Sequence, residues 1–435
     1  MRRTAEQSCW APGSAPDREL VAAPLGPGSR PLTPADLDTV DDVTVLREVG
    51  GRSGREVLLI GGVRHHPVIF RYPDQAGPVM LHLNGLTDRH RARADLAFLD
   101  EGQLTYLLPA DGTWSYRFVA AADMPHGDLP ADVGATRPGW LAVHAAGRPD
   151  PANPESIPDF RGGYRSSVHT GPAACIHPAW ADTDTGGRLV IELTFPVGLP
   201  PAGPAVGSTD LRTPYGDNMR TCYLSPAAGP DAPVLIVLDG RMWYWLGLPV
   251  ALDRRGGRRP HLLMVDSGSL DQRAADLPHP ERVGAVVAAA LAATAPLIGV
   301  HDPSRTLVCG QSFGGLAAAG LLVHRSDLVS AAVAQSGSFW FAPGREPRRD
   351  DPTPGVLLEE VRALAEAGET LPGRRLVVQV GTDEDDMVLL SRACRDTLRF
   401  AGVDVTHREY RGGHDYAWWR HGLLHALDEL DGIAP

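Results

Sequence analysis

Residues 305–315 read RTLVCGQSFGG and decide the fold. The apolar run Arg305–Cys309 predicts a buried strand, and residues 315–324 predict a helix. Between them, residues 310–314 form a G-x-S-x-G motif, in which small glycines allow a strained turn that exposes the serine. A glycine-rich turn with an N-capping serine is the alternative interpretation. The order strand, motif, helix favours Ser312 as a nucleophile on an α/β-hydrolase fold, with its hydroxyl at the positive end of a helix.

Strands and helices alternate on both sides of this motif. Apolar runs at 234–238 and 262–265 are typical of strands buried on both faces. The other expected strands are 188–195, 218–224, 329–335, 375–380 and 405–410, and the other expected helices are 280–296 and 423–430. We expect a mostly parallel, doubly wound sheet that opens with an antiparallel pair.

The first half of the chain has a different pattern. Short strands, at 56–60, 67–72, 79–84, 103–108 and 114–118, are separated by Gly, Pro and Asp, as in a smaller all-β sandwich domain. The sequence therefore predicts four parts, which are a Pro/Ala-rich arm (1–40), an N-terminal β-sandwich domain (41–160), a linker (161–187) and a catalytic α/β-hydrolase domain (188–435).

Composition limits the possible partners and compartments. The 435 residues carry 41 basic and 53 acidic side chains, a net charge of −12, which argues against nucleic acid and anionic membrane surfaces as partners. The sequence contains no uninterrupted run of eighteen apolar residues, so we expect no transmembrane helix. The five cysteines are scattered and support neither a disulfide framework nor a zinc site. Because the N-terminus also lacks the apolar core of a signal peptide, we expect a cytoplasmic protein.

A serine nucleophile needs a base and an orienting acid, which follow it along the chain in this fold. His414 lies between Gly413 and the last expected helix, in the loop where such a hydrolase keeps its base. The acid is expected after the strand at 375–380, where residues 383–386 offer four carboxylates. The residues alone do not choose among these four.

Stabilisation of the developing oxyanion requires two amides. One is expected from Phe313, the residue after the nucleophile. The other is expected from the loop after the strand at 234–238, at Arg241 or, as an alternative, Gly240.

Together these residues resemble the enterochelin esterase family. The resemblance rests on LDGxxW (238–243), RAxDLP (273–278), GQSFGGL (310–316), QSGSFW (335–340), GGHD (412–415) and WRxGL (419–423). Weaker matches in the first half are NGLTD (84–88), WxYxF (114–118) and DPxNP (150–154). The resemblance implies that Glu384 is the acid, because the family has a glutamate followed closely by a methionine, here Met387. One extra acidic residue intervenes in this chain, so Asp383 and Asp385 remain alternatives.

The family hydrolyses the trilactone of enterobactin-type siderophores, which are anionic catecholates. The resemblance therefore implies a serine esterase that acts on a ferric or iron-free siderophore for intracellular iron release, with no cofactor or metal of its own. Arg241 and Arg273 would contact the anion, and Trp243, Trp340 and either Trp418 or Trp419 would stack on catechol rings. For each tryptophan, a role in the core is the alternative.

Three other functions remain open on the same scaffold. An acyltransferase or thioesterase would use the same triad with a different acceptor. A general carboxylesterase would act on short acyl esters. The third alternative is a ligand-binding module with a catalytically inactive hydrolase domain. The presence of both Ser312 and His414 argues against it.

Overall fold

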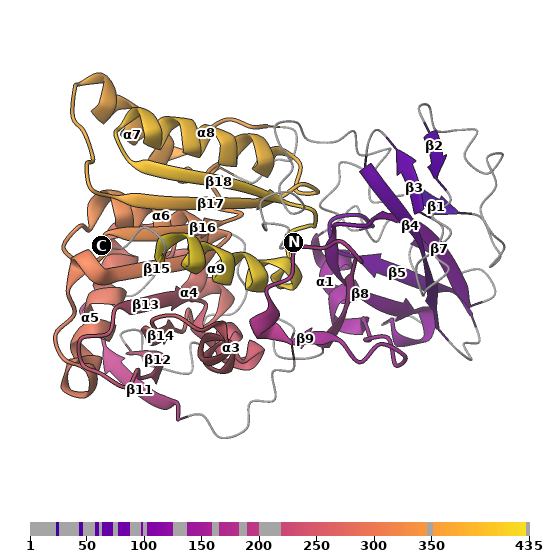
Figure 1. Ribbon diagram of the computed structural model, residues 1–435, viewed down its shortest axis with the longest axis horizontal. Helices are drawn as coiled ribbons and strands as arrows, with labels where there is room; N and C mark the ends of the chain where they lie inside the picture. Colours follow the sequence, from indigo (N-terminus) through magenta and orange to yellow (C-terminus); the bar gives the residue numbers. More distant parts are fainter. Residues whose placement is uncertain are drawn as a thin grey trace. The chain divides into compact units, whose positions relative to one another are not determined.

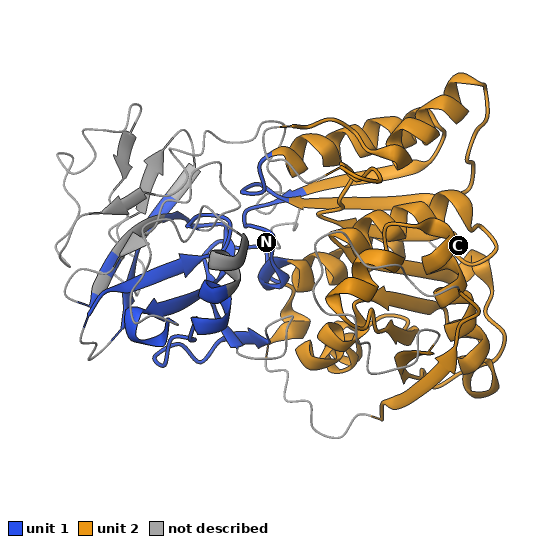
Figure 2. Ribbon diagram, turned by 180° about the vertical axis from the view of Figure 1, so that it is seen from behind, with its two compact units in different colours: residues 1–176, 381–385, 409–418 blue, residues 177–380, 386–408, 419–435 orange. Residues whose placement is uncertain are grey.

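The computed structural model describes most of the chain, as two compact units (Figure 2). The described residues are 23–25, 43–46, 57–60, 63–72, 77–87, 97–98, 102–124, 137–158, 165–181, 189–199, 219–345 and 351–431. The first unit contains residues 1–176 together with two later segments, 381–385 and 409–418. The second contains 177–380, 386–408 and 419–435.

Two five-stranded sheets make up the β-rich part of the first unit. Their strand orders are β1-β7-β4-β3-β2 and β6-β5-β8-β10-β9, and every pairing that is resolved within them is antiparallel. The strands are β1 (Ala23–Leu25), β2 (Val43–Leu46), β3 (Val57–Ile60), β4 (Val63–Arg71), β5 (Val79–Leu83), β6 (Ala97–Phe98), β7 (Gln103–Pro109), β8 (Thr113–Ala120), β9 (Ser156–Pro158) and β10 (Arg165–Thr170).

Alternate side chains of these strands form the core between the sheets. Trp114, Tyr116 and Phe118 of β8 point to the same face and pack with Phe70 of β4 and Leu108 of β7. This period of two is what places every second residue of a strand on the buried face. The all-β sandwich expected for this half of the chain is present.

The boundaries of this unit differ from the expected ones. Strand β10 falls inside the stretch 161–187, where we expected a linker, and it pairs with β8 and β9. Helix α1 (Arg137–Ala146) was not expected. Of the expected arm, residues 23–25 form β1 and pair with β7, whereas 1–22 and 26–40 lie outside the described residues.

An eight-stranded sheet is the centre of the second unit. Its order is β11-β12-β14-β13-β15-β16-β17-β18, and the pairs from β14 through β13, β15 and β16 to β17 are parallel. The strands are β11 (Ile191–Pro196), β12 (Met219–Ser225), β13 (Val234–Leu238), β14 (His261–Val265), β15 (Thr306–Gln311), β16 (Ala331–Gln335), β17 (Arg375–Gly381) and β18 (Asp404–Tyr410). The expected opening pair, β11 with β12, is antiparallel, and β12 also runs antiparallel to β14. These findings confirm the α/β-hydrolase type of sheet.

Helices cover this sheet (Figure 1). Side chains of α5, α6, α7 and α8 share one apolar cluster with every second residue of β13, Val234, Ile236 and Leu238. The intervening residues of β13 are also buried but outside that cluster, as strand alternation requires. The helices are α2 (Gly240–Leu246), α3 (Leu248–Arg255), α4 (Leu270–Asp276), α5 (Pro280–Ile298), α6 (Phe313–His324), α7 (Val356–Glu366), α8 (Asp386–Phe400) and α9 (Tyr416–Asp431).

Helix α5 is, by length and composition, apolar enough to cross a membrane, and it is the one such helix in the described part of the chain. Its Val283, Val287 and Leu291 are nonetheless buried in the apolar cluster of the sheet. The helix is therefore part of the core of the second unit, because its apolar side chains already have protein neighbours.

The cysteines differ from the expectation in one respect. Cys222, Cys309 and Cys394 are free and buried, and burial raises the pKa of the Cys222 thiol to about 12. Cys175 is disulfide-bonded. The scattered spacing gave no indication of this bond.

Candidate active site

Ser312 occupies a strained turn between β15 and α6. Its backbone has φ 58° and ψ −120°, and α6 begins at the next residue. A Cβ on Gly310 would lie 2.1 Å from the carbonyl oxygen of Gly314, so this position requires glycine. Ser312 N donates to the carbonyl of Gln335 (3.0 Å), and its hydroxyl lies 3.4 Å from that of Ser338. The turn has the geometry of a nucleophile elbow.

The loop after β13 contains a second strained residue. Asp239 has φ 57° and precedes α2, whose first residues are Gly240 and Arg241. Arg273, from α4, donates to both carboxylate oxygens of Asp239, through Nε (2.8 Å) and Nη2 (2.7 Å). The same Nη2 donates to the carbonyl of Gln311 (3.1 Å). One guanidinium thus joins the loop that starts α2 to the residue before Ser312.

In the first unit, His414 and Glu384 form a close pair. Nδ1 of His414 lies 2.6 Å from Oε2 of Glu384, and since a carboxylate only accepts, Nδ1 carries the proton. The other oxygen of Glu384 accepts from the amide of Gly381 (2.7 Å). The carboxylate is 1% exposed, whereas the imidazole is 27% exposed. The buried carboxylate of Glu384 therefore fixes the orientation of the His414 ring.

The neighbouring acids have other positions. Asp383 accepts a hydrogen bond from the indole Nε1 of Trp114 (2.9 Å), and both side chains are buried. Asp385 has φ 51° and comes directly before α8, which begins at Asp386. The hydrogen bond of Glu384 to His414 supports Glu384 as the acid among the four carboxylates.

A row of three buried glutamines runs beneath the elbow. Gln311, Gln335 and Gln379 are paired in register on β15, β16 and β17. Gln311 Nε2 donates to Gln335 Oε1 (2.9 Å), and Gln335 Nε2 donates to Gln379 Oε1 (2.7 Å). The row is continued at one end by the indole of Trp243, which donates to Gln311, and at the other by the carbonyl of Gly422 in α9, which accepts from Gln379. This row was not predicted from the sequence, although a glutamine followed by a serine at the end of both β15 and β16 is a visible signal.

The residues expected to bind a ligand have different surroundings. The Arg241 side chain is 39% exposed and pairs with Asp266 at 2.5 Å. The Arg273 side chain is 13% exposed and forms an ion pair with Asp239, so its guanidinium binds another part of the protein. Trp243 is fully buried, and Trp418 and Trp419 are 2% and 4% exposed, which leaves these rings no open face for stacking. Trp340 is half-buried and packs near Phe313.

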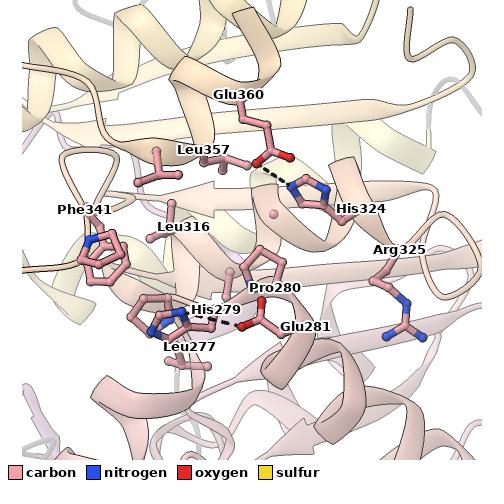
Figure 3. A pocket seen from close by; sticks show the side chains of 15 residues that line it. Leu277, His279, Pro280, Glu281, Leu316, His324, Arg325, Phe341, Leu357 and Glu360 are labelled. Atoms are coloured by element: carbon pink, nitrogen blue, oxygen red, sulfur yellow. Dashed lines mark ion pairs between the residues drawn. The ribbon is translucent and has the colours of Figure 1, made fainter. Parts of the chain in front are cut away.

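A well-formed cavity of about 450 Å³ lies elsewhere in the second unit (Figure 3). It is lined by residues of α5, α6 and α7 and contains two ion pairs, His324 with Glu360 (3.6 Å) and His279 with Glu281 (3.8 Å). Among its described lining residues, neither Ser312, His414 nor Glu384 occurs. The chemistry of the candidate site is therefore not in this cavity.

Known proteins with similar sequences support the expected family. Residues 68–180 match the family model described as enterochelin esterase, N-terminal, and residues 280–430 match the one described as "Putative esterase". The iron(III) enterobactin esterase of Dickeya dadantii is 29% identical over 373 residues, covering 80% of this chain and 81% of the relative. The iron(III) salmochelin esterase of Escherichia coli O6:H1 is 28% identical over 404 residues, covering 88% and 89%. These matches support the enterochelin esterase family for this chain.

Solved structures of enterochelin esterases have the same fold. The ferric enterobactin esterase of Salmonella typhimurium aligns with a TM-score of 0.66 at 22% identity, covering 92% of this chain and all of that one. A Shigella flexneri enterobactin esterase determined in the presence of enterobactin aligns with a TM-score of 0.63 at 21% identity, covering 92% of this chain and 98% of that one. The resemblance inferred from the motifs is confirmed.

Proposed function

We propose that this protein is a serine esterase that hydrolyses the ester bonds of a catecholate siderophore, with the ferric complex as substrate, and so releases iron inside the cell. The observation that carries the proposal is the Ser312 elbow, in a chain whose relatives are named iron(III) enterobactin and salmochelin esterases. The iron belongs to the substrate, and the ester chemistry uses side chains and backbone amides of the protein together with water.

In the proposed mechanism Ser312, His414 and Glu384 form the triad. Nε2 of His414 removes the hydroxyl proton while Oγ of Ser312 attacks the ester carbonyl. Glu384 holds the Nδ1 proton and stabilises the imidazolium, a role supported by the 2.6 Å contact. His414 then protonates the departing alkoxide, and water, deprotonated in turn by His414, releases the acyl group from the serine.

The amides of Phe313 and Arg241, or of Gly240 in place of Arg241, are the proposed oxyanion donors. Phe313 begins α6 and Gly240 begins α2, so these amides lie in the first turns of helices, where the peptide dipoles favour negative charge. Each such donor is worth about 3 kcal/mol of transition-state stabilisation.

For substrate binding we retain Arg241 and Trp340. The Arg241 side chain is accessible enough to meet an anionic catecholate, and Trp340 is half-buried. Arg273 and Trp243, by contrast, are engaged within the protein framework. The binding contribution of Arg241 is then electrostatic, and it should weaken with added salt.

Hydrolysis of ferric and iron-free catecholate trilactones, followed by mass spectrometry, tests the proposal. Wild-type protein should open the ring, Ser312→Ala should not, and Ser391→Ala, which removes a buried serine hydroxyl from α8, should behave like wild type. The ferric complex should be the faster substrate. Cleavage of simple esters without ring opening would overturn the siderophore assignment and leave a general carboxylesterase, whereas transfer to an alcohol or amine would indicate an acyltransferase.

We also propose a cytoplasmic location, where ferric siderophores would be processed after uptake. Cell fractionation with thiol trapping tests this. Disulfides are rare in a reducing cytoplasm, so the Cys175 bond makes the measurement informative. Recovery in the cytoplasmic fraction with Cys175 reduced in the cell supports the location, and recovery outside the cytoplasm overturns it.

A further inference from the structure

The first three residues of β8 are hydrogen-bonded to the segments that carry Glu384 and His414. Thr113 N donates to the carbonyl of Arg411 (3.1 Å), and Ser115 N donates to Oδ2 of Asp415 (2.5 Å). Between them, Trp114 Nε1 donates to Oδ2 of Asp383 (2.9 Å). Two of these acceptors flank His414 in sequence, and the third precedes Glu384.

The two segments are also bonded to each other. Asp383 N donates to the carbonyl of Gly412 (3.0 Å), and Thr382 N donates to the carbonyl of Tyr410 (2.8 Å). On the other side, a Cβ on Gly413 would lie 2.5 Å from Oδ1 of Asn84, so the backbone beside His414 is in direct contact with the turn after β5. A shift of the Asp383 segment would therefore move Glu384 and the His414 segment together.

Trp114 is well suited to hold this arrangement. Its side chain is fully buried in the core of the sandwich, with Phe70, Tyr116 and Phe118 in the same cluster. A close-packed indole has one allowed position, so its N–H points in a fixed direction. Asp383 is 1% exposed, and a buried carboxylate depends strongly on the donors it has.

We propose that Trp114 is a positioning residue for the pair His414–Glu384, and that the β-sandwich thereby sets the geometry of the acid–base machinery. This inference rests on the proposed triad. Trp114 need not contact the substrate, because it acts through Asp383 and the adjoining Glu384. An error of about 1 Å in the placement of a catalytic group can cost about a hundredfold in rate, so this constraint is large enough to matter.

The test replaces Trp114 by phenylalanine, which keeps an aromatic ring in the core and removes the N–H. The matched control is Trp180→Phe, which removes another buried indole donor, bonded to the carbonyl of Arg420 at 2.8 Å. A nitrophenyl ester gives kcat and KM, and a fluorophosphonate gives the rate at which Ser312 is labelled. Neither reagent requires the siderophore assignment to be correct.

For Trp114→Phe we expect kcat and the labelling rate to fall about tenfold to hundredfold with KM nearly unchanged. Trp180→Phe should keep the wild-type kcat, KM and labelling rate. A Trp114→Phe protein that labels at the wild-type rate, or that loses activity only in proportion to its folded fraction, overturns the proposal.

A second variant covers the case in which Trp114→Phe does not fold. Asp383→Asn keeps an acceptor for the indole but removes its charge, so a smaller loss of kcat, about threefold to tenfold, is expected because hydrogen bonds to charged groups are roughly twice as strong as neutral ones. A wild-type kcat and a wild-type labelling rate in Asp383→Asn would contradict the proposal. If wild-type protein does not cleave the nitrophenyl ester and is not labelled by the fluorophosphonate, the proposed serine chemistry fails, which is a distinct outcome.

Discussion

Arg273 binds Asp239 through two parallel hydrogen bonds of 2.8 and 2.7 Å, one to each carboxylate oxygen. Asp239 is 3% exposed and has a left-handed backbone, a conformation that costs free energy unless neighbouring groups hold it. The planar fork of an arginine matches a carboxylate in a way that a point charge does not. Arg273 therefore holds the residue before α2, the helix whose first turn has a proposed oxyanion donor. It also binds the carbonyl of Gln311, the residue before the nucleophile.

Arg273→Lys should lower kcat at least about tenfold on both a simple ester and a siderophore, with little change in KM, because lysine keeps the charge but loses the fork. Arg241→Ala is the matched comparison and should have the opposite signature, a higher KM for the anionic siderophore and nearly normal turnover of a neutral ester. Steady-state kinetics on both substrates separate the two. An Arg273→Lys protein with raised KM for the siderophore alone would make Arg273 a substrate contact after all.

Glu384→Gln should reduce kcat by about a thousandfold or more. The uncharged amide cannot stabilise the imidazolium, and it can bind His414 in the wrong tautomer. Asp385→Asn is the control for loss of a neighbouring charge and should keep most of the activity. Both proteins can be compared by ester turnover at constant pH, with circular dichroism to confirm folding. A larger loss in Asp385→Asn or Asp383→Asn than in Glu384→Gln would move the acid role to that residue.

Much of the second unit could be predicted from the sequence because its signals are local. The apolar runs of β13, β14 and β15 and the motif around Ser312 each report a strand or turn within about ten residues. The side chains that support these elements could not be predicted in this way. Arg273 and Asp239 are 34 positions apart, and Trp114 and Asp383 are 269 apart, so only the folded chain shows that they are bonded.

The choice among the acids illustrates the same limit. Four consecutive carboxylates have similar chemistry, and a sequence pattern shifted by one residue cannot separate them. The turn after β17 separates them by giving each a different direction, toward His414 for Glu384 and toward Trp114 for Asp383. The sequence left Trp243 open between a core role and a binding role for a related reason, since an aromatic side chain suits a core and a binding site equally well.

Gln335→Leu should destabilise the protein by about 2 kcal/mol or more. Gln335 is fully buried and donates both to Gln379 and to the carbonyl of Trp419, and loss of its amide removes a partner from Gln311 as well. A buried polar group left without its partner costs about 1–3 kcal/mol. Urea unfolding measures the change. The double variant Gln311→Leu/Gln335→Leu should lose less than the sum of the two single changes, and strict additivity would show that the glutamine row is not one network.

His421 should make the protein less stable as the pH falls below about 6.5. It is 4% exposed, and burial, together with nearby Arg420, His425 and His177, lowers its pKa well below the usual 6.5. Its Nδ1 accepts a hydrogen bond from the amide of His177 (2.9 Å), a contact that a protonated ring cannot keep.

The unfolded chain protonates His421 near pH 6.5 and the folded chain does not. The unfolded state therefore binds more protons as the pH falls, and the free energy of unfolding decreases. Between pH 7.5 and 5.5 this one group should lower the free energy of unfolding by an amount on the order of 1 kcal/mol. Urea unfolding of wild type and His421→Asn, whose Oδ1 can accept the same hydrogen bond, should give slopes that differ by about one proton in this window and agree above pH 7.5. Equal slopes at pH 5.5 would mean that His421 is protonated in the folded protein.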